Sequence, residues 1–454
     1  MKASRLLSAA VLGAVVLLTG TISARAAKPI AIPFKEYRLK NGLRVVLSED
    51  HSAPTYSIAV TYNVGSRDEK PGRTGFAHLF EHMMFQGSEN VGKGEQFILI
   101  QNNGGGMNGT TNSDRTNYFE TLPANQLDLG LYLEADRIRS LAINQANLDN
   151  QRNAVQEERR LRIDNQPYGK TYEAIGETVY DNFGYKHSTI GSMADLNAAS
   201  VQDVQDFFKR YYAPNNAVIA IVGDFKSDEA MTKLKQYFEN IPAQPAPPQP
   251  DMAEPEQKGE RRKTIEDQFA QVPRIDIDWK IPPGNTADFY ALDVLGDILG
   301  GGQSSRLYQK LVKDKEVAVQ CFGGTQERRG TSLETMIVLA RPGRDLGEIE
   351  KLVGEEIERV KNEPVADSEI EKIHMVSRHQ EAQSLQSTLS RAMRLAQDAV
   401  FYNDPGLINT REGKIEKVTK EDIQRVAKKY LTDANKTVII TMPMPKKAVA
   451  KAGA

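Results

Sequence analysis

The chain has 454 residues, enough for two large domains or about three of average size. Its 58 lysines and arginines nearly balance its 60 aspartates and glutamates, so the sequence lacks the clustered basic excess of a nucleic-acid-binding surface. The hydrophobic fraction of 40% and charged fraction of 26% are those of a globular protein. A single cysteine, Cys321, excludes an internal disulfide and any C-x-x-C zinc site.

Residues 1–26 have the pattern of a secretory signal peptide. Lys2 and Arg5 give a positive start, residues 6–18 are mostly apolar, and Ala-Arg-Ala at residues 24–26 offers a small-x-small cleavage site. A retained membrane anchor is the alternative, but the apolar run is short for a span. No cysteine lies near the cleavage site, which argues against a lipoprotein. We therefore expect cleavage near Ala26, a periplasmic location in a bacterium and no stable membrane insertion.

The first elements of the mature chain are predicted to be strands. Residues 36–39 and 43–47 read as two strands joined at Asn41-Gly42, a strong hairpin signal. Residues 56–62 alternate between polar and apolar side chains, which predicts a third strand.

The run from Thr74 to Phe85 predicts a helix and carries the first candidate site. His78 and His82 are four residues apart, which places both imidazoles on one helical face, and Glu81 reaches the same side. Two such imidazoles bind zinc well, and a third protein ligand with a water would complete a catalytic tetrahedron. A carboxylate beside that water can take its proton. The alternative is an ordinary half-buried helical face, since a bare His-x-x-Glu-His run also occurs by chance.

The stretch after this helix contains a glycine-rich turn and two more predicted strands. Gly104-Gly105-Gly106 permits unusual backbone angles and close approach. The following residues, Met107 to Thr111, suit an exposed strand, with a loop as the alternative, and residues 116–122 read as another strand. Residues 127–165 are mostly helical in pattern.

An internal repeat indicates two domains. The run Asp203 to Ile221 matches the run Asp422 to Ile440 without gaps, each copy being a helix that ends in Tyr, a polar turn and an apolar strand. Between the copies lies a proline-rich stretch that predicts an extended linker. We therefore divide the mature chain into residues 28–241, a linker at 242–262, and residues 263–454. The second half has no His-x-x-Glu-His run, and its matching region, residues 291–299, is predicted to lack polar ligands.

The third metal ligand is expected on the helix predicted from Leu148 to Ile163. Glu158 has Ala154, Val155 and Leu161 at neighbouring helical positions, so it is predicted to point inward, where an acidic group is costly unless it is paired or bound to metal. Glu157 lies on a more solvated face and is the weaker candidate.

The other histidines are less suitable ligands. His187 is a rival, but it lies in a loop rich in Gly and Tyr, where a structural role is favoured. His51 lies at a strand end, and His374 and His379 are spaced so that they do not stack on a helix. We interpret these last three as surface or capping histidines.

With these residues placed, the chain resembles the pitrilysin family of zinc peptidases, which includes insulin-degrading enzyme and the mitochondrial processing peptidases. The resemblance covers nearly all of the mature chain. It rests on the inverted zinc motif at residues 78–82, on the run from Asn153 to Glu158, and on the run from Gly300 to Leu307.

The resemblance implies an α+β fold of two homologous domains, each a mixed, largely antiparallel sheet packed with helices. It also implies one zinc ion per chain, bound by His78, His82 and Glu158, with Glu81 as general base. The segment 108–111 is similar to the family's edge strand that pairs with peptide, which makes Asn108, Gly109 and Thr110 the expected substrate-binding residues.

Two departures from the family pattern affect the expected site. Gln151 stands where some members carry a glutamate, seven residues before the zinc glutamate, and it can still hydrogen-bond to a ligand. Val312 and Val319 stand where many members use an arginine and a tyrosine to hold substrate, and neither can donate a hydrogen bond. We therefore expect a heterodimer with a homologous, metal-free subunit that supplies this pair, although Arg306 or Tyr308 could substitute locally.

The expected function is that of a zinc endopeptidase that cleaves short or unfolded peptides. A non-catalytic assembly subunit is one alternative, and a peptide-binding subunit with structural zinc is another.

Overall fold

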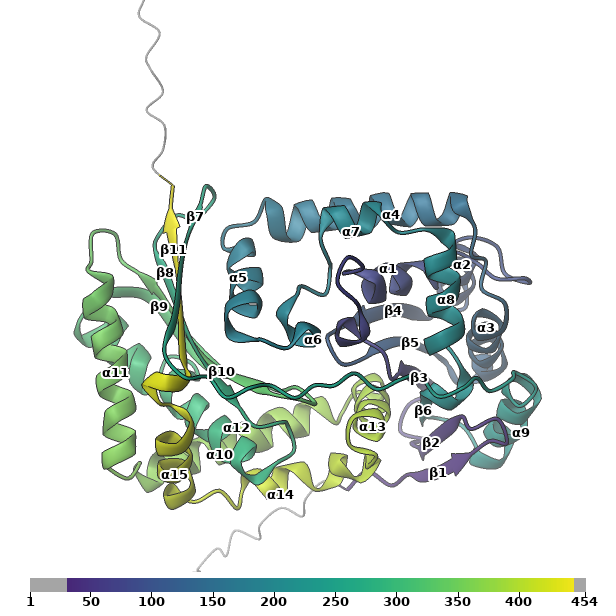
Figure 1. The fold of residues 1–454 in the computed structure, drawn as a ribbon. Coiled ribbons are helices and arrows are strands. Elements are labelled where there is room, and N and C mark those ends of the chain that lie inside the picture. The colour runs from purple at the N-terminus through teal and green to yellow at the C-terminus, as the bar shows by residue number, and fades with distance from the viewer. Residues whose placement is uncertain (1–30, 445–454) are drawn as a thin grey trace, which may run out of the picture. The chain divides into compact units, whose positions relative to one another are not determined.

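The computed structural model describes residues 31–444, and two sheets of related topology follow each other along this part of the chain (Figure 1). The predicted signal peptide lies outside the described residues.

The first sheet is six-stranded, with the order β1-β2-β6-β3-β5-β4. The β2–β6 pair is parallel and the other pairs are antiparallel. Its strands are β1 (Lys35–Arg38), β2 (Arg44–Glu49), β3 (Thr55–Tyr62), β4 (Gly106–Thr111), β5 (Thr116–Pro123) and β6 (Ala217–Gly223). The strands and the hairpin predicted for this half are confirmed, and β4 is the outermost strand beside β5.

The second sheet is five-stranded, with the order β7-β11-β8-β10-β9. Only the β11–β7 pair within it is parallel. Its strands are β7 (Arg261–Asp267), β8 (Arg274–Ile281), β9 (Ala318–Gln326), β10 (Ser332–Ala340) and β11 (Lys436–Pro443). The predicted fold class is confirmed, since both sheets are mixed, largely antiparallel and packed with helices.

Helices connect the strands in both halves (Figure 1). In the first half they are α1 (Phe76–Met83), α2 (Glu95–Asn102), α3 (Leu127–Ser140), α4 (Gln145–Arg159), α5 (Gly169–Val179), α6 (Phe183–Lys186), α7 (Met193–Asn197), α8 (Val201–Tyr211) and α9 (Ser227–Phe238). In the second half they are α10 (Ala287–Gly300), α11 (Leu346–Asn362), α12 (Asp367–Ser384), α13 (Thr388–Tyr402), α14 (Arg411–Ile415) and α15 (Lys420–Tyr430). Short π-helical segments, η3 (Arg160–Asp164) and η5 (Tyr308–Asp314), follow α4 and precede β9.

The predicted repeat is confirmed down to its hydrogen bonds. Helices α8 and α15 both begin with a capping box, in which an aspartate at the third helical position bonds back to the residue before the helix. In the first copy the Asn216 side chain donates to the Tyr211 carbonyl over 2.8 Å, and in the second copy Asn435 donates to the Tyr430 carbonyl over the same distance. The polar turn therefore has one defined task, which is to satisfy the end of the helix before the strand begins.

Each sheet is covered on one face by helices of its own half and on the other face by a helix of the opposite half. The first sheet packs its main core against α1, α3, α8 and α9, and its second face against the apolar side of α13. The second sheet packs against α10, α11 and α15, and its second face meets α5. Each sheet therefore has a main core from its own half and a second, smaller core to which both halves contribute.

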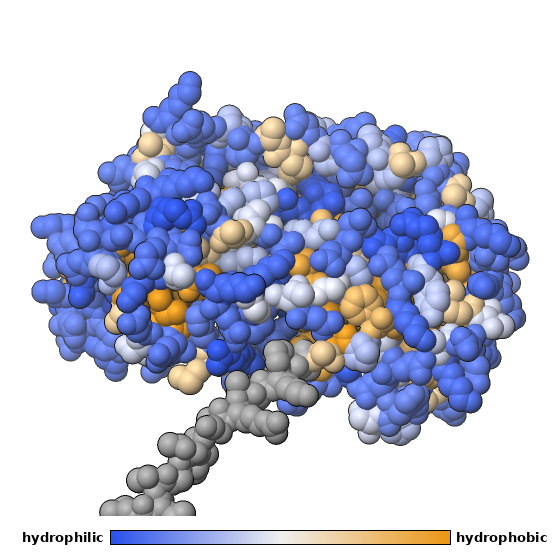
Figure 2. Space-filling model, turned by 90° about the horizontal axis from the view of Figure 1, so that it is seen from below, coloured by the Kyte–Doolittle hydropathy of each residue, from blue (hydrophilic) through white to orange (hydrophobic). Residues whose placement is uncertain are grey.

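Within the described residues, no helix is both long enough and apolar enough to span a lipid bilayer. On the face seen in Figure 2, hydrophilic residues dominate, and hydrophobic residues gather only in small areas.

Candidate metal centre

Helix α1 presents His78, Glu81 and His82 beside β4 because its other face is fixed in the core. Leu79, Phe80 and Met83 are buried against the first sheet and α8. The two imidazole rings have centroids 4.8 Å apart with planes 75° to each other, the arrangement predicted from their spacing.

The start of α1 is anchored by Glu69, a residue that sequence reasoning missed. Its buried carboxylate accepts hydrogen bonds from the backbone N–H groups of Gly75 (2.9 Å) and Ala77 (2.7 Å), which have no partners within the helix. His187 contacts the same carboxylate through Nε2 at 2.8 Å and the Phe183 carbonyl through Nδ1. The structure therefore gives His187 a structural contact and separates it from His78 and His82.

Helix α4 brings Glu158 to the two histidines. Its Oε2 lies 3.6 Å from His78 Nε2 and 3.2 Å from His82 Nε2. Two ligand atoms on one tetrahedral zinc ion are about 3.3 Å apart, given bond lengths of about 2.0–2.1 Å. In the described part of the chain, these three residues form the one group of potential metal ligands whose donor atoms all lie within 4.8 Å of one another. The residues present therefore fit a zinc ion.

The structure places Glu158 beside the two histidines, as the prediction requires of a third ligand, but part of the basis of that prediction was wrong. Leu161 is 57% exposed and Ala154 is also exposed, so these neighbours do not mark a core-facing side. Glu158 points toward the histidines, whereas Glu157 is exposed and pairs with Arg160.

The electrostatics of the three residues suit metal binding. Burial, with a contribution from neighbouring His82, lowers the pKa of His78 to about 4, so this imidazole is neutral at pH 7. The close contact with His82 is the main cause that lowers the pKa of Glu158. Neutral imidazole and ionised carboxylate are the protonation states that a metal ion requires of its ligands.

Two further side chains orient these ligands. His82 Nδ1 lies 3.3 Å from Gln151 Oε1, and an amide oxygen can only accept, so Nδ1 carries the proton and Nε2 is left free. Arg162 Nη1 lies 3.0 Å from Glu158 Oε1, the carboxylate oxygen farther from the histidines. Sequence reasoning identified Gln151 but missed Arg162, whose four-residue spacing from Glu158 was the available signal.

Glu81 lies between α1 and β4 and is 7% exposed. Burial raises the pKa of its carboxyl, and Thr111 at the end of β4 donates a hydrogen bond of 2.6 Å to its Oε2. The close approach of strand to helix depends on Gly109, because a Cβ there would lie 3.2 Å from Glu81 Cγ and 3.3 Å from the Phe85 ring.

The predicted substrate-binding residues all lie on β4, the outermost strand of the first sheet. The Gly109 N–H bonds to the side chain of Asn108 over 2.8 Å, and Thr110 donates to Asn117 over 2.6 Å. Gly109 of this strand lies beside Glu81. Its backbone N–H is bound by the Asn108 side chain, and a peptide carbonyl could take the place of that side chain.

The remaining histidines lie outside this centre. His51 is 58% exposed at its side chain and pairs with Asp224. His379 is exposed on α12, and His374 on the same helix has a buried Nε2 without a hydrogen-bond partner, so His374 is not a plain surface residue.

Two valines of the second half occupy the positions where many family members carry the arginine and tyrosine that hold substrate. Val319, on β9, is 52% exposed, and Val312 packs partly buried against the second core. Arg306 donates to both carboxylate oxygens of Glu369 at 2.7 Å, so its guanidinium is already engaged. This contact argues against Arg306 as a local substitute.

The helix that matches α1 in the second half, α10, is not devoid of potential ligands, and the prediction that its polar ligands are missing was wrong. Asp293 and Asp297 are four residues apart on it, and Glu334 of β10 is fully buried beside Gly296, with no hydrogen-bond partner for either carboxylate oxygen. Burial raises the pKa of Asp297 to about 6, and burial also raises the pKa of Glu334 well above its ordinary value. These carboxyls are farther apart than the ligands of the first half.

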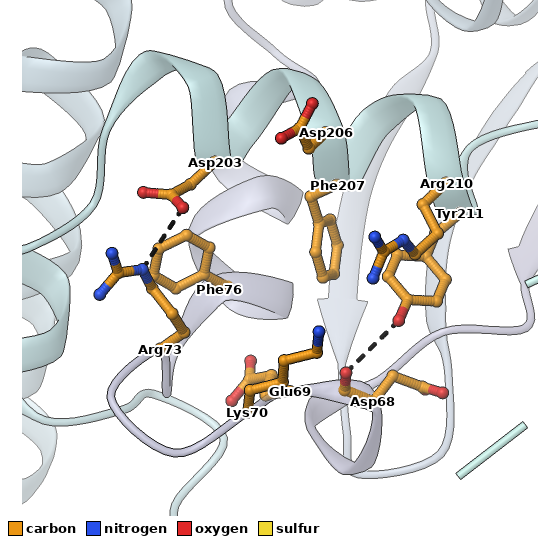
Figure 3. Close-up of a pocket in the computed structure, with 10 residues that line it drawn as sticks. All are labelled: Asp68, Glu69, Lys70, Arg73, Phe76, Asp203, Asp206, Phe207, Arg210 and Tyr211. Carbon is orange, nitrogen blue, oxygen red and sulfur yellow. Dashed lines mark hydrogen bonds and ion pairs between the residues drawn. The ribbon is translucent and has the colours of Figure 1, made fainter. Parts of the chain in front are cut away.

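A separate cavity of about 220 Å³ lies against the start of α1 (Figure 3). Phe76, Phe207 and Tyr211 form its apolar walls, and Arg73 pairs with Asp203 at its edge. No residue of the candidate metal centre lines it.

Comparison with known proteins gives two family matches and a curated relative of similar length. Residues 44–192 match the family described as "Insulinase (Peptidase family M16)", and residues 198–375 match "Peptidase M16 inactive domain". The zinc protease PqqE of Helicobacter pylori is 30% identical over 408 residues, covering 89% of this chain and 92% of that protein.

Two solved structures share the fold. A protease from Helicobacter pylori superposes with a TM-score of 0.87 at 30% identity, covering 91% of this chain and all of that one. The first half of the periplasmic protease PqqL from Escherichia coli gives a TM-score of 0.75 at 17% identity, covering 92% of this chain and 93% of that one.

Proposed function

The chain belongs to peptidase family M16, and on that premise we propose that it is a zinc-dependent endopeptidase that hydrolyses short or unfolded peptides. The observation that carries the proposal is the convergence of His78, His82 and Glu158 on one point, with the carboxylate of Glu81 beside it. A structural zinc site would need a fourth protein ligand, and no fourth ligand joins this group within residues 31–444.

The chain's own residues account for the proposed chemistry. His78, His82 and Glu158 would hold one zinc ion, which when bound supplies a Lewis acid that acidifies a water and polarises a carbonyl. Glu81 accepts the proton of the attacking water and delivers it to the leaving amine. Burial favours this exchange because a carboxyl with a raised pKa holds a proton more readily than an exposed one.

The peptide is proposed to add to β4 as a further strand. Main-chain hydrogen bonds to an outer strand recognise extended shape more than side-chain identity, which suits short or unfolded substrates. Asn108 would release the Gly109 N–H to a peptide carbonyl, and Thr110 would continue the same edge.

The test of the catalytic proposal is Glu81→Gln. We expect it to lower kcat on a fluorogenic peptide by about 10²–10⁴-fold, since that is the range that general-base catalysis contributes, while zinc content by elemental analysis stays unchanged. Glu157→Gln, a matched change on the exposed side of α4, is expected to retain activity. Unchanged hydrolysis by Glu81→Gln would remove this residue from the base role, and zinc binding without turnover in the wild type would favour a peptide-binding subunit.

We also propose that the active form is a heterodimer with a homologous, metal-free subunit. Val312 and Val319 offer no donor for a substrate carbonyl, and Arg306 is held by Glu369. The chain alone should therefore be weakly active, and a homologous subunit with arginine and tyrosine at the matching positions should activate it. Full activity of the purified chain alone, with no gain on adding the partner, would overturn this proposal.

Export to the periplasm is proposed from residues 1–26. N-terminal sequencing of the protein from a bacterial periplasmic fraction should show a start near residue 27, and a retained Met1 would contradict it.

A further inference from the structure

We propose that Thr111 is a positioning residue for this reaction. Its hydroxyl holds Oε2 of Glu81, so that Oε1 is the oxygen that accepts the proton of water. This inference rests on the proposed function, because it concerns the residue proposed as the base.

The hydrogen bonds around Thr111 determine where its single hydroxyl proton goes. Thr111 Oγ1 lies 2.6 Å from Glu81 Oε2 and 3.3 Å from Thr116 Oγ1. Thr116 donates its own proton to the Val64 carbonyl over 3.0 Å. An ionised carboxylate can only accept, so the short contact requires Thr111 to donate to Glu81.

The Glu81 side chain makes no other hydrogen bond within the described residues. It is 7% exposed, and Gly109 lies against its Cγ, so neither water nor a second rotamer has much room on that side. A carboxylate in this position would otherwise be free to rotate about its terminal torsion, which is broad for glutamate. The Thr111 bond therefore selects one orientation and leaves Oε1 unengaged.

The position of Thr111 is fixed by contacts that do not depend on substrate. The neighbouring Arg115 donates to the Thr110 carbonyl over 2.8 Å and reaches Gln397 of α13 at 3.3 Å. Asp114, in the same β4–β5 turn, accepts from Tyr185 and from the backbone of Arg329. The second half of the chain thus secures the turn that carries Thr111, and the hydroxyl is in place before a peptide arrives, as preorganised catalytic groups require.

The proton balance of the step is simple. The O–H bond of water breaks as Glu81 Oε1 takes the proton, and the hydroxide oxygen bonds to the peptide carbonyl carbon while the C=O π pair moves to the carbonyl oxygen. That pair then re-forms the C=O bond as the C–N bond breaks, and the same proton passes to the amine nitrogen. Thr111 keeps its own proton throughout, so it is not a catalytic group.

The test compares Thr111→Val, which keeps the shape and removes the hydroxyl, with Thr111→Ser, which keeps the hydroxyl. Both are assayed in whichever assembly shows full activity. We expect Thr111→Val to lower kcat by about 10–100-fold with KM within about twofold, because small misplacements of a reacting group cost up to about 10²-fold. Thr111→Ser should recover kcat to within about threefold of wild type. Thr121→Val on β5, whose hydroxyl bonds Ser57 and not Glu81, is the matched control and should retain activity and zinc.

Three results would overturn the inference. They are an unchanged kcat in Thr111→Val, a Thr111→Ser variant as impaired as Thr111→Val, and a loss that falls on KM alone, which would mean that Thr111 only orders the strand. If Thr111→Val does not fold or does not bind zinc, Thr111→Ala replaces it. Its kcat and KM are then compared with those of Thr111→Ser, and the same three results would overturn the inference. An inactive wild type would instead refute the proposed function, so the two failures are distinguishable.

Discussion

Gln151 offers a direct test of how α4 controls the proposed metal centre. Its side-chain oxygen accepts the Nδ1 proton of His82, which keeps Nε2 deprotonated and aimed toward Glu158. Gln151→Leu removes this acceptor and allows the imidazole to change tautomer and turn. Gln151→Glu replaces it with a charged acceptor and raises the basicity of His82 as a ligand.

The expected magnitudes follow from the geometry of this contact. Loss of a residue that orients a metal ligand weakens metal binding by about 10–100-fold. The His82–Gln151 contact is 3.3 Å, long for an N–H···O bond, which places Gln151→Leu near the lower end. We expect about tenfold weaker zinc binding, or about 1.4 kcal/mol. Gln151→Glu should bind zinc about tenfold more tightly, since a charge-assisted hydrogen bond is about twice as strong as a neutral one.

Zinc affinity is measured by competition with a chromophoric chelator at pH 7.5, with circular dichroism to verify folding. Gln145→Leu is the matched control, because Gln145 lies in the first turn of the same helix and bonds only the exposed side chain of Asp149. Zinc affinity of Gln151→Leu within twofold of wild type, or weaker binding by Gln151→Glu, would refute the role of this hydrogen bond.

Three further predictions concern stability. Burial raises the pKa of Asp278 to about 8, so the folded state keeps a proton that the unfolded state loses above its ordinary value, and wild-type stability falls as pH rises between about 4 and 8. Asp278→Asn should remove this dependence of the unfolding free energy on pH, so that the variant gains about 2.7 kcal/mol relative to the wild type between pH 5 and 7. The same change of unfolding free energy with pH in both proteins, measured by urea denaturation, would contradict it. Asp114→Ala leaves Arg67, Tyr185 and the Arg329 backbone N–H without their buried acceptor. It should lower the unfolding free energy by about 3–5 kcal/mol in chemical denaturation. A loss under 1 kcal/mol would show that other contacts hold the β4–β5 turn. Leu395→Ala on α13 should cost about 2–5 kcal/mol and broaden or lower the thermal transition, and an unchanged Tm would argue against the shared core.

The elements near the site were predictable because their signals are local. The Asn41-Gly42 turn, the apolar spacing around His78 and His82, and the capping residues of α8 and α15 each act within one turn of a helix or hairpin. Glu158 was predictable only by its position on a helix. Of the apolar neighbours used in the prediction, Val155 is buried in the core, whereas Ala154 and Leu161 are exposed. The prediction of Glu158 therefore depended on the need for a third ligand more than on periodicity.

The contacts that organise the centre are tertiary contacts between residues distant in the sequence, which no local sequence pattern predicts. Thr111 meets Glu81 across 30 residues, and Glu69 meets His187 across 118. A threonine on a strand and a glutamate in a polar loop have many structural explanations, so only the packing of β4 on α1 and of the 183–187 segment on η1 (Ser66–Asp68) reveals their partners. Arg162 is the exception, because its spacing from Glu158 is a helical one.

Helix α5 of the first half covers the second sheet, and helix α13 of the second half covers the first sheet. This exchange changes what the second half contributes. Gly169 and Thr388, the first residues of α5 and α13, are 219 positions apart, as are Val201 and Lys420, the first residues of α8 and α15. The exchanged helices are therefore equivalent parts of the repeat, and each covers the sheet of the opposite half. Helix α13 packs on β3, β5 and β6 of the sheet that carries β4 and provides Gln397 to the β4–β5 turn. The half without the zinc motif therefore completes a core of the sheet to which the proposed substrate strand belongs. Cutting the chain at the proline-rich stretch would expose an apolar face on both fragments, so the half with the zinc motif cannot be treated as an independent domain.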